Sequence, residues 1–60
     1  MNLNDKVKVV KLNDKHNGEI GTIIKVSKFL YVPVTVYKVK FNEFTKEYFY
    51  SDLKVVYEDW

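Results

Sequence analysis

The sequence contains no cysteine, so neither a disulfide nor a thiolate metal site can form, and we expect a reducing, cytoplasmic setting. Arginine is also missing, and all ten positive side chains are lysines. Lysine meets phosphate as a point charge and lacks the planar fork with which arginine reads guanine, so sequence-specific groove reading is disfavoured. Alanine and glutamine, two strong helix formers, are absent as well.

Membrane and catalytic patterns are equally scarce. No apolar run approaches the length of a membrane span, and residues 1–5 lack the apolar core of a signal peptide, so we expect no membrane partner. His16 is the only histidine, and no serine stands in a nucleophile motif. No residue spacing is typical of a metal site, and the carboxylates of Glu58 and Asp59 are expected to be solvated. We therefore expect no enzymatic activity, no metal and no cofactor.

What the chain does contain is apolar and aromatic residues, at 47% and 17% of its 60 residues. This composition lies far from that of disordered chains, and the length suits one small domain, residues 1–60. The formal net charge of +2 favours solubility and only weakly suggests a polyanionic partner.

The hydrophobic pattern predicts an all-β protein, because β-branched and aromatic residues alternate with polar ones over short runs and no run has helical spacing. We expect strands at 7–11, 20–26, 35–41, 47–50 and 54–57, with one helical turn at 51–53 capped by Ser51 or Asp52. Residues 29–33, an apolar run ending at Pro33, are either a connecting loop or the irregular start of the third strand.

The alternation also predicts which residues face the core. Either Val9 or Val10 must point outward or sit at a bulge, because they are adjacent. The second strand is expected to bury one face, and Gly21 within it indicates a bend or a close backbone approach. The residues predicted on that face are Ile20, Thr22, Ile24 and Val26. In the third strand, Tyr37, Val39 and Phe41 are predicted to face the core, with lysines 38 and 40 in water.

Residues 5–26 resemble a KOW motif, a family of ribosomal and transcription elongation proteins that is built on small SH3-like barrels. The matching residues are Asp5, Val7, Val9, Val10, Gly18, Gly21, Ile24 and Val26. Residues 37–41 and 51–53 resemble the third strand and the short turn before the last strand of such barrels, including Tudor-like ones. The resemblance implies a five-stranded antiparallel SH3-like barrel with one helical turn before the last strand. It also implies contact with nucleic acid in a ribosome or transcription complex.

Two places are candidates for that contact. One is the loop at 11–18, where Lys11, Lys15 and His16 could meet phosphate, although the same composition is typical of a solvated turn. The other is the hairpin of the third and fourth strands. A turn at 43–45 would place Lys40 opposite Tyr48 and Lys38 opposite Tyr50. Such interleaved cations and rings suit single-stranded nucleic acid, or they merely stabilise an exposed sheet face.

Several aromatic residues fall outside the strand pattern, namely Phe29, Tyr31, Phe44, Tyr57 and Trp60. Exposed together, Phe29, Tyr31, Phe44 and Trp60 would mark a protein–protein surface or a homodimer interface. Alternatively, Phe29 and Tyr31 fold over the open end of the barrel and Trp60 packs back from the terminus. The sequence therefore predicts a non-catalytic binding module for RNA or DNA. The alternative is a protein–protein interaction module, such as a small regulator or inhibitor encoded by a phage or mobile element.

Overall fold

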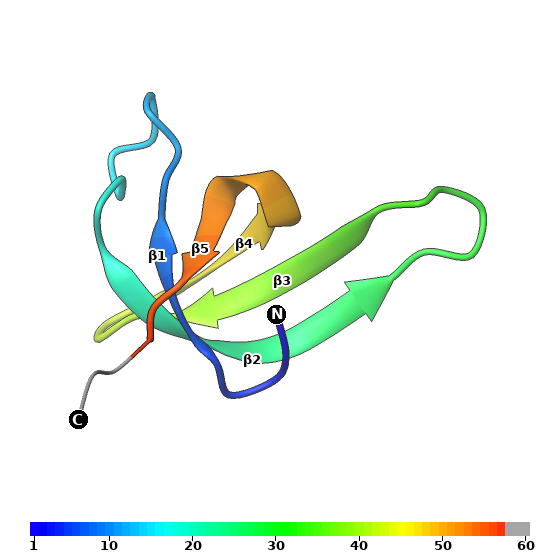
Figure 1. The fold of residues 1–60 in the computed structure, drawn as a ribbon, viewed down its shortest axis with the longest axis horizontal. Helices are drawn as coiled ribbons and strands as arrows, with labels where there is room; N and C mark the ends of the chain where they lie inside the picture. The colour runs from blue at the N-terminus through cyan, green and yellow to red at the C-terminus, as the bar shows by residue number, and fades with distance from the viewer. Residues whose placement is uncertain (58–60) are drawn as a thin grey trace.

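The computed structural model describes residues 1–57 and consists of one antiparallel sheet of five strands with a single helical turn (Figure 1). The elements are β1 (Lys6–Val9), β2 (Ile20–Lys28), β3 (Thr35–Lys40), β4 (Thr45–Phe49), the 3-10 turn η1 (Tyr50–Asp52) and β5 (Leu53–Val55). The strand order in the sheet is β4-β3-β2-β1-β5, so β4 and β5 form its edges. The all-β prediction is confirmed. Within residues 1–57, no helix is long and apolar enough to cross a membrane.

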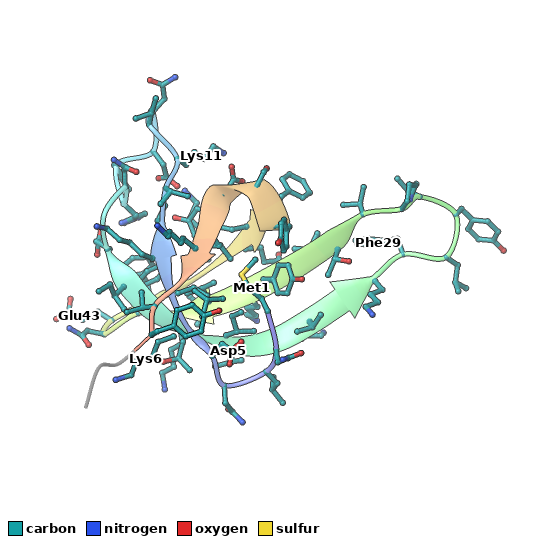
Figure 2. All side chains as sticks on the ribbon, viewed as in Figure 1. Met1, Asp5, Lys6, Lys11, Phe29 and Glu43 are labelled. Carbon is teal, nitrogen blue, oxygen red and sulfur yellow. The ribbon has the colours of Figure 1, made fainter. Side chains whose placement is uncertain are left out.

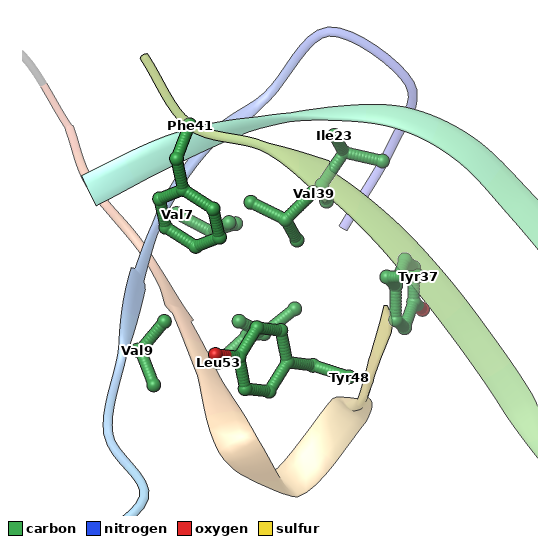
Figure 3. Close-up of a cluster of buried hydrophobic side chains, with 8 residues drawn as sticks. All are labelled: Val7, Val9, Ile23, Tyr37, Val39, Phe41, Tyr48 and Leu53. Atoms are coloured by element: carbon green, nitrogen blue, oxygen red, sulfur yellow. The ribbon is translucent and has the colours of Figure 1, made fainter. Parts of the chain in front are cut away.

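The core is formed by the inward side chains of all five strands and of residue 41 just beyond β3 (Figure 3). The buried side chains are Val7, Val9, Ile23, Tyr37, Val39, Phe41, Tyr48 and Leu53. At the end of β1, Val9 is 1% exposed and Val10 is 43% exposed, which confirms that only one of them faces inward. β1 ends at Val9, two residues before the predicted end, and the Val10 N–H donates to the Asp52 carbonyl of η1 at 2.8 Å on the β5 side of β1.

The predicted face of β2 is wrong for its first half. The structure buries Gly21 and Ile23, whereas Ile20 and Ile24 are exposed. A β-bulge between Ile23 and Lys25 shifts the register against β3, so the inward side changes parity and Val26 packs against the core as predicted.

The close approach predicted at Gly21 is confirmed, and it explains why this residue lies on the buried face. A Cβ at position 21 would lie 2.6 Å from Val39 Cγ1 and 2.7 Å from the Lys40 carbonyl oxygen. No side chain fits there, so β2 and β3 pack directly on each other at this point.

The prediction for β3 is confirmed on its buried side, where Tyr37, Val39 and Phe41 lie; Lys40 is exposed as predicted, whereas Lys38 is half-buried. The predicted pairing of β3 with β4 is wrong by three residues. Lys40 faces Thr45 instead of Tyr48, because the turn closes earlier, with the Phe41 N–H donating to the Phe44 carbonyl at 2.8 Å.

An odd shift of register moves every side chain to the other face. Tyr48 is therefore in the core at 3% exposure, opposite Tyr37, while Phe49 is at the surface at 53% exposure, opposite Val36.

The helical turn forms one residue earlier than predicted, as η1. The N-cap is Phe49, so the prediction of Ser51 or Asp52 at that position is wrong; Asp52 stands at the third position of the turn, and its carboxylate accepts the Phe49 N–H at 3.4 Å. The last strand spans Leu53–Val55 instead of the predicted 54–57. It begins one residue earlier because the buried Leu53 side chain already belongs to the sheet.

Residues 29–34 form the connecting loop at the end of a long hairpin. β2 and β3 extend beyond the rest of the sheet, and the loop lies at the tip of this projection (Figure 1). Of the two alternatives for this run, the connecting loop is the one observed.

Candidate nucleic-acid interface

The structure does not bring together the four residues of the predicted lysine–tyrosine ladder. Lys38 and Lys40 lie on the outer face of β3, but Tyr48 points into the core and Tyr50 belongs to η1. Lys38 instead has Glu47 opposite it on β4 and Lys25 opposite it on β2. No interleaved platform of cations and rings forms on this hairpin, because the register differs from the one predicted.

The loop at 11–18 is held by contacts within the protein. His16 Nδ1 lies 2.7 Å from Glu19 Oε2, and its ring centroid lies 4.4 Å from that of Phe44. Lys11 and Lys15 are exposed, and Lys11 lies well apart from Lys6 in the view of Figure 2. The contribution of this loop to binding stays a prediction for its two lysines, while His16 has a clear packing role.

Asp14 anchors the same loop to β4. Lys46 Nζ donates to both carboxylate oxygens of Asp14 at 3.1 Å, and the His16 N–H donates to Oδ1 at 3.1 Å. The Asp14 side chain is 4% exposed. The Tyr48 hydroxyl, followed by the His16 N–H and the Lys46 ammonium, holds the pKa of Asp14 well below its usual range, against an opposing contribution from burial.

The Tyr48 hydroxyl itself is buried and has no hydrogen-bond partner of normal geometry among the described residues. Burial, together with the neighbouring Asp14 charge, raises the pKa of Tyr48. The Asp14 carboxylate is held by the His16 N–H and by two bonds from the Lys46 ammonium, and the Tyr48 hydroxyl adds a nearby dipole.

The aromatic residues assigned to a partner surface divide into two groups. Phe44 is half-buried, and its ring centroid lies 4.7 Å from that of Phe41. It thus covers one end of the core, and the prediction that it is a free surface ring is wrong. Phe29 and Tyr31 are exposed on the projecting hairpin, Tyr31 by 95%, and Trp60 lies outside the described residues.

A different cationic surface emerges from the register of the sheet. Residues directly opposite each other in antiparallel strands lie on the same face. Six side chains facing away from the core form two adjacent rows, Lys40–Thr22–Lys6 and Ile20–Lys8–Lys54. We name this set the lysine face. Thr22 is half-buried and the other five residues are exposed.

The lysine face is contiguous, and the strands that form it are positively charged. Lys6, Thr22 and Lys40 line a single shallow groove together with Asn42. The strands β1, β2, β3 and β5 contain seven lysines and no acidic residue. Acids adjoin the lysine face on two sides: Glu19 and Glu43 lie in the neighbouring groove at its rim, and Glu47 stands opposite Lys38, one row from Lys40.

Three of the four lysines on this face were not singled out by sequence reasoning. Lys40 was selected for its place in the third strand, whereas Lys6, Lys8 and Lys54 come from strands far apart in the chain. The available signal was the segregation of charge, since lysines occupy the strands and most acids occupy the loops. The pairing that unites these residues is non-local and cannot be read from spacing.

Exposed aromatic residues gather elsewhere. Phe29, Val36 and Phe49 line one groove, and Phe49 also borders a second groove with Pro33 and Tyr50. This aromatic surface lies around the projecting hairpin and η1. It is the part of the described structure that best suits contact with another protein.

Within residues 1–57, no group of three or more histidine, aspartate or glutamate side chains is arranged to hold a metal ion. Comparisons of the chain with protein-family models, with curated proteins and with solved structures each find no match.

Proposed function

We propose that this chain is a non-catalytic nucleic-acid-binding module, built on a small SH3-like barrel and working alone or within a ribosome or transcription complex. The observation that carries the proposal is the lysine face, where four lysines from three strands lie together on strands without any acid. Lysines contact the phosphate backbone, which supplies most of the affinity of sequence-independent binding. In the absence of arginine, reading of base edges has little support.

The barrel part of the proposal is supported by how the ends of the sheet approach each other. β5 pairs with β1, and η1 contacts both β3 and β5. The Val10 N–H bonds the Asp52 carbonyl, joining the end of β1 to the turn that follows β4. A short helical turn before a last strand that lies beside the first is also the arrangement expected from the resemblance to KOW and Tudor-like domains.

Titration of wild type and two matched triple variants tests the proposal. The first variant, Lys8→Gln/Lys40→Gln/Lys54→Gln, removes three charges from the lysine face; Lys6 stays because it also interacts within the protein. The second, Lys11→Gln/Lys15→Gln/Lys28→Gln, removes three exposed charges elsewhere. With an oligonucleotide at low salt, we expect affinity to fall by about tenfold or more in the first variant only, because lost phosphate contacts weaken binding directly.

Two outcomes would contradict this assignment. Loss of affinity in the second variant alone would move the site to the loop at 11–18, and absence of any binding by wild type at low salt would end the nucleic-acid hypothesis. Circular dichroism spectra of the three proteins control for folding, since exposed lysines contribute little to the core.

The second candidate function is a protein–protein module, such as a small regulator or inhibitor. The exposed rings of Phe29, Tyr31, Phe49 and Tyr50 favour it, because a small domain rarely exposes this much aromatic surface without a partner. Sedimentation of wild type and of Phe49→Ser tests the homodimer version. A monomer at high concentration excludes it, and capture from a host lysate of nucleic acid alone counts against any protein partner.

A further inference from the structure

We infer that the lysine face takes the sugar–phosphate backbone of a double-stranded nucleic acid, without sequence preference, rather than a single strand. This inference rests on the proposed function and narrows its ligand. The observations that carry it are the chemistry of the six positions on the face and the distances over which they are spread.

The first observation is that none of the six positions on the lysine face is aromatic. They are four lysines, one threonine and one isoleucine, and Tyr48, which was predicted opposite Lys40, is in the core. Proteins that hold single strands without sequence preference rely on aromatic side chains on which successive bases stack. The lysine face has the cations of such a site but lacks its stacking platforms.

Among the described residues, no exposed ring lies within the two rows, and only Tyr57 borders the face, at its Lys54 edge. Phe49 lies four residues along β4 from Thr45, the residue opposite Lys40, which is roughly 13 Å at the rise of a β-strand. Tyr57 follows β5 and borders a groove with Met1, Tyr50 and Leu53, to which Lys54 contributes. A single strand on the lysine face would therefore meet one ring at its edge and none along its rows, so most of its bases would stay in water.

The second observation is the width of the cationic surface. Lys40 and Lys54 are separated by three interstrand spacings, about 14 Å along the curved sheet, and the two rows are about 7 Å apart. A duplex carries phosphates of two backbones across grooves roughly 6 and 12 Å wide, with about twice the axial charge density of one strand. A wide, shallow set of lysines can contact both backbones at once.

The uncharged members of the lysine face fit the same ligand. Thr22 lies between Lys40 and Lys6, where its hydroxyl can donate to a phosphate oxygen. Ile20 stands opposite Lys8 and offers a flat apolar contact to sugars. Since no arginine is present and lysine is a poor reader of bases, the contact carries no sequence information.

The test compares one sequence in four forms: duplex DNA, duplex RNA of the same sequence, and each corresponding single strand. Fluorescence anisotropy is recorded for wild type at two salt concentrations. We expect duplexes to bind about tenfold or more tightly than either single strand, and a duplex of scrambled sequence to bind equally well. The DNA and RNA arms show which duplex geometry the lysine face prefers.

Equal or tighter binding of single strands overturns the inference while leaving the proposed function intact. Strong dependence on the sequence of the duplex overturns it as well, whereas failure of all four ligands at low salt removes the proposed function itself. Tyr57→Ala tests whether bases stack on the one ring beside the lysine face. Unchanged affinities for duplexes and single strands support the inference. If wild type prefers single strands and the variant loses only that binding, the inference is contradicted.

Discussion

Lys46 Nζ lies 3.1 Å from both carboxylate oxygens of Asp14, a residue 32 positions earlier in the chain. This bidentate contact ties the loop at 11–18 to β4 and thereby helps to fix the strand that closes the second hairpin. Lys46 also stands 5.2 Å from the centroid of the Tyr48 ring, so one lysine contacts both an acid and an aromatic residue. Composition alone would predict that both Lys46 and Asp14 are solvated, yet they connect two distant parts of the fold.

Replacing Asp14 should remove part of the acid sensitivity of the protein. The folded-state pKa of Asp14 is lowered, so this carboxylate stabilises the fold above its unfolded pKa of about 3.9 and ceases to do so as the pH falls. We expect Asp14→Asn to have a thermal midpoint a few degrees below wild type at neutral pH. The gap should narrow between about pH 5 and pH 2, as measured by circular dichroism melts.

Asp52→Asn serves as the control for that experiment, because the Asp52 carboxylate accepts one long bond of 3.4 Å, from the Phe49 N–H. A gap between Asp14→Asn and wild type that stays constant down to pH 2 would contradict the role of the ionised carboxylate.

Removing the hydroxyl of Tyr48 should not destabilise the protein, because the cost of burying an unpaired hydroxyl offsets its attraction for the Asp14 carboxylate. The hydroxyl oxygen is buried without a partner of normal geometry, and such groups cost about 1–3 kcal/mol when left unpaired. We therefore expect the free energy of unfolding of Tyr48→Phe, from urea titration, to equal or exceed that of wild type. A loss of about 1 kcal/mol would show instead that the hydroxyl donates to Asp14. Tyr50→Phe, at an exposed ring, controls for the change in residue type.

Replacement of either glycine by alanine should destabilise the protein, for different reasons at the two positions. At Gly21 the new Cβ would meet the Lys40 carbonyl oxygen at 2.7 Å, and overpacking of this kind costs about 1–3 kcal/mol or more. At Gly18 there is open space, but φ is +92°, which a side chain tolerates poorly.

We expect Gly18→Ala to lose about 1 kcal/mol and remain folded, whereas Gly21→Ala loses more and broadens the amide NMR signals of β2 and β3. Equal, small losses at both sites would show that β2 and β3 can move apart at Gly21.

The sequence predicted local features well and long-range ones poorly, for physical reasons. The alternation in residues 37–41 depends only on the strand period of two, and the structure agrees with it. The pairing of β4 with β3 depends on where the turn closes, and a difference of three residues moved Tyr48 into the core. The bulge after Ile23 had no visible signal, so the buried face of β2 was misassigned.

The same distinction explains the candidate site. Each lysine on the lysine face is visible as an outward residue of its own strand, but their assembly depends on three separate strand pairings. Those pairings follow from packing of the whole core rather than from any local motif. The resemblance to KOW motifs suggested contact with nucleic acid through the loop at 11–18. In the structure, His16 and Asp14 of this loop instead make contacts within the protein.

Lys8 and Lys54 lie directly opposite each other on β1 and β5, where like charges repel and an opposite-charge pair is favourable by about 0.2–1 kcal/mol. We therefore expect Lys54→Glu to raise the free energy of unfolding at low salt, with the gain shrinking as salt screens the pair. The same change should weaken duplex binding and make its salt dependence shallower, by about one unit in the slope of log K against log salt. Lys28→Glu, at an exposed position opposite Thr35, makes the same change in net charge without a facing lysine. If Lys28→Glu stabilises the protein as much as Lys54→Glu does, the change in net charge is responsible and not the Lys8–Lys54 pair. If only Lys54→Glu both stabilises the fold and weakens duplex binding, Lys54 serves the ligand at the expense of stability.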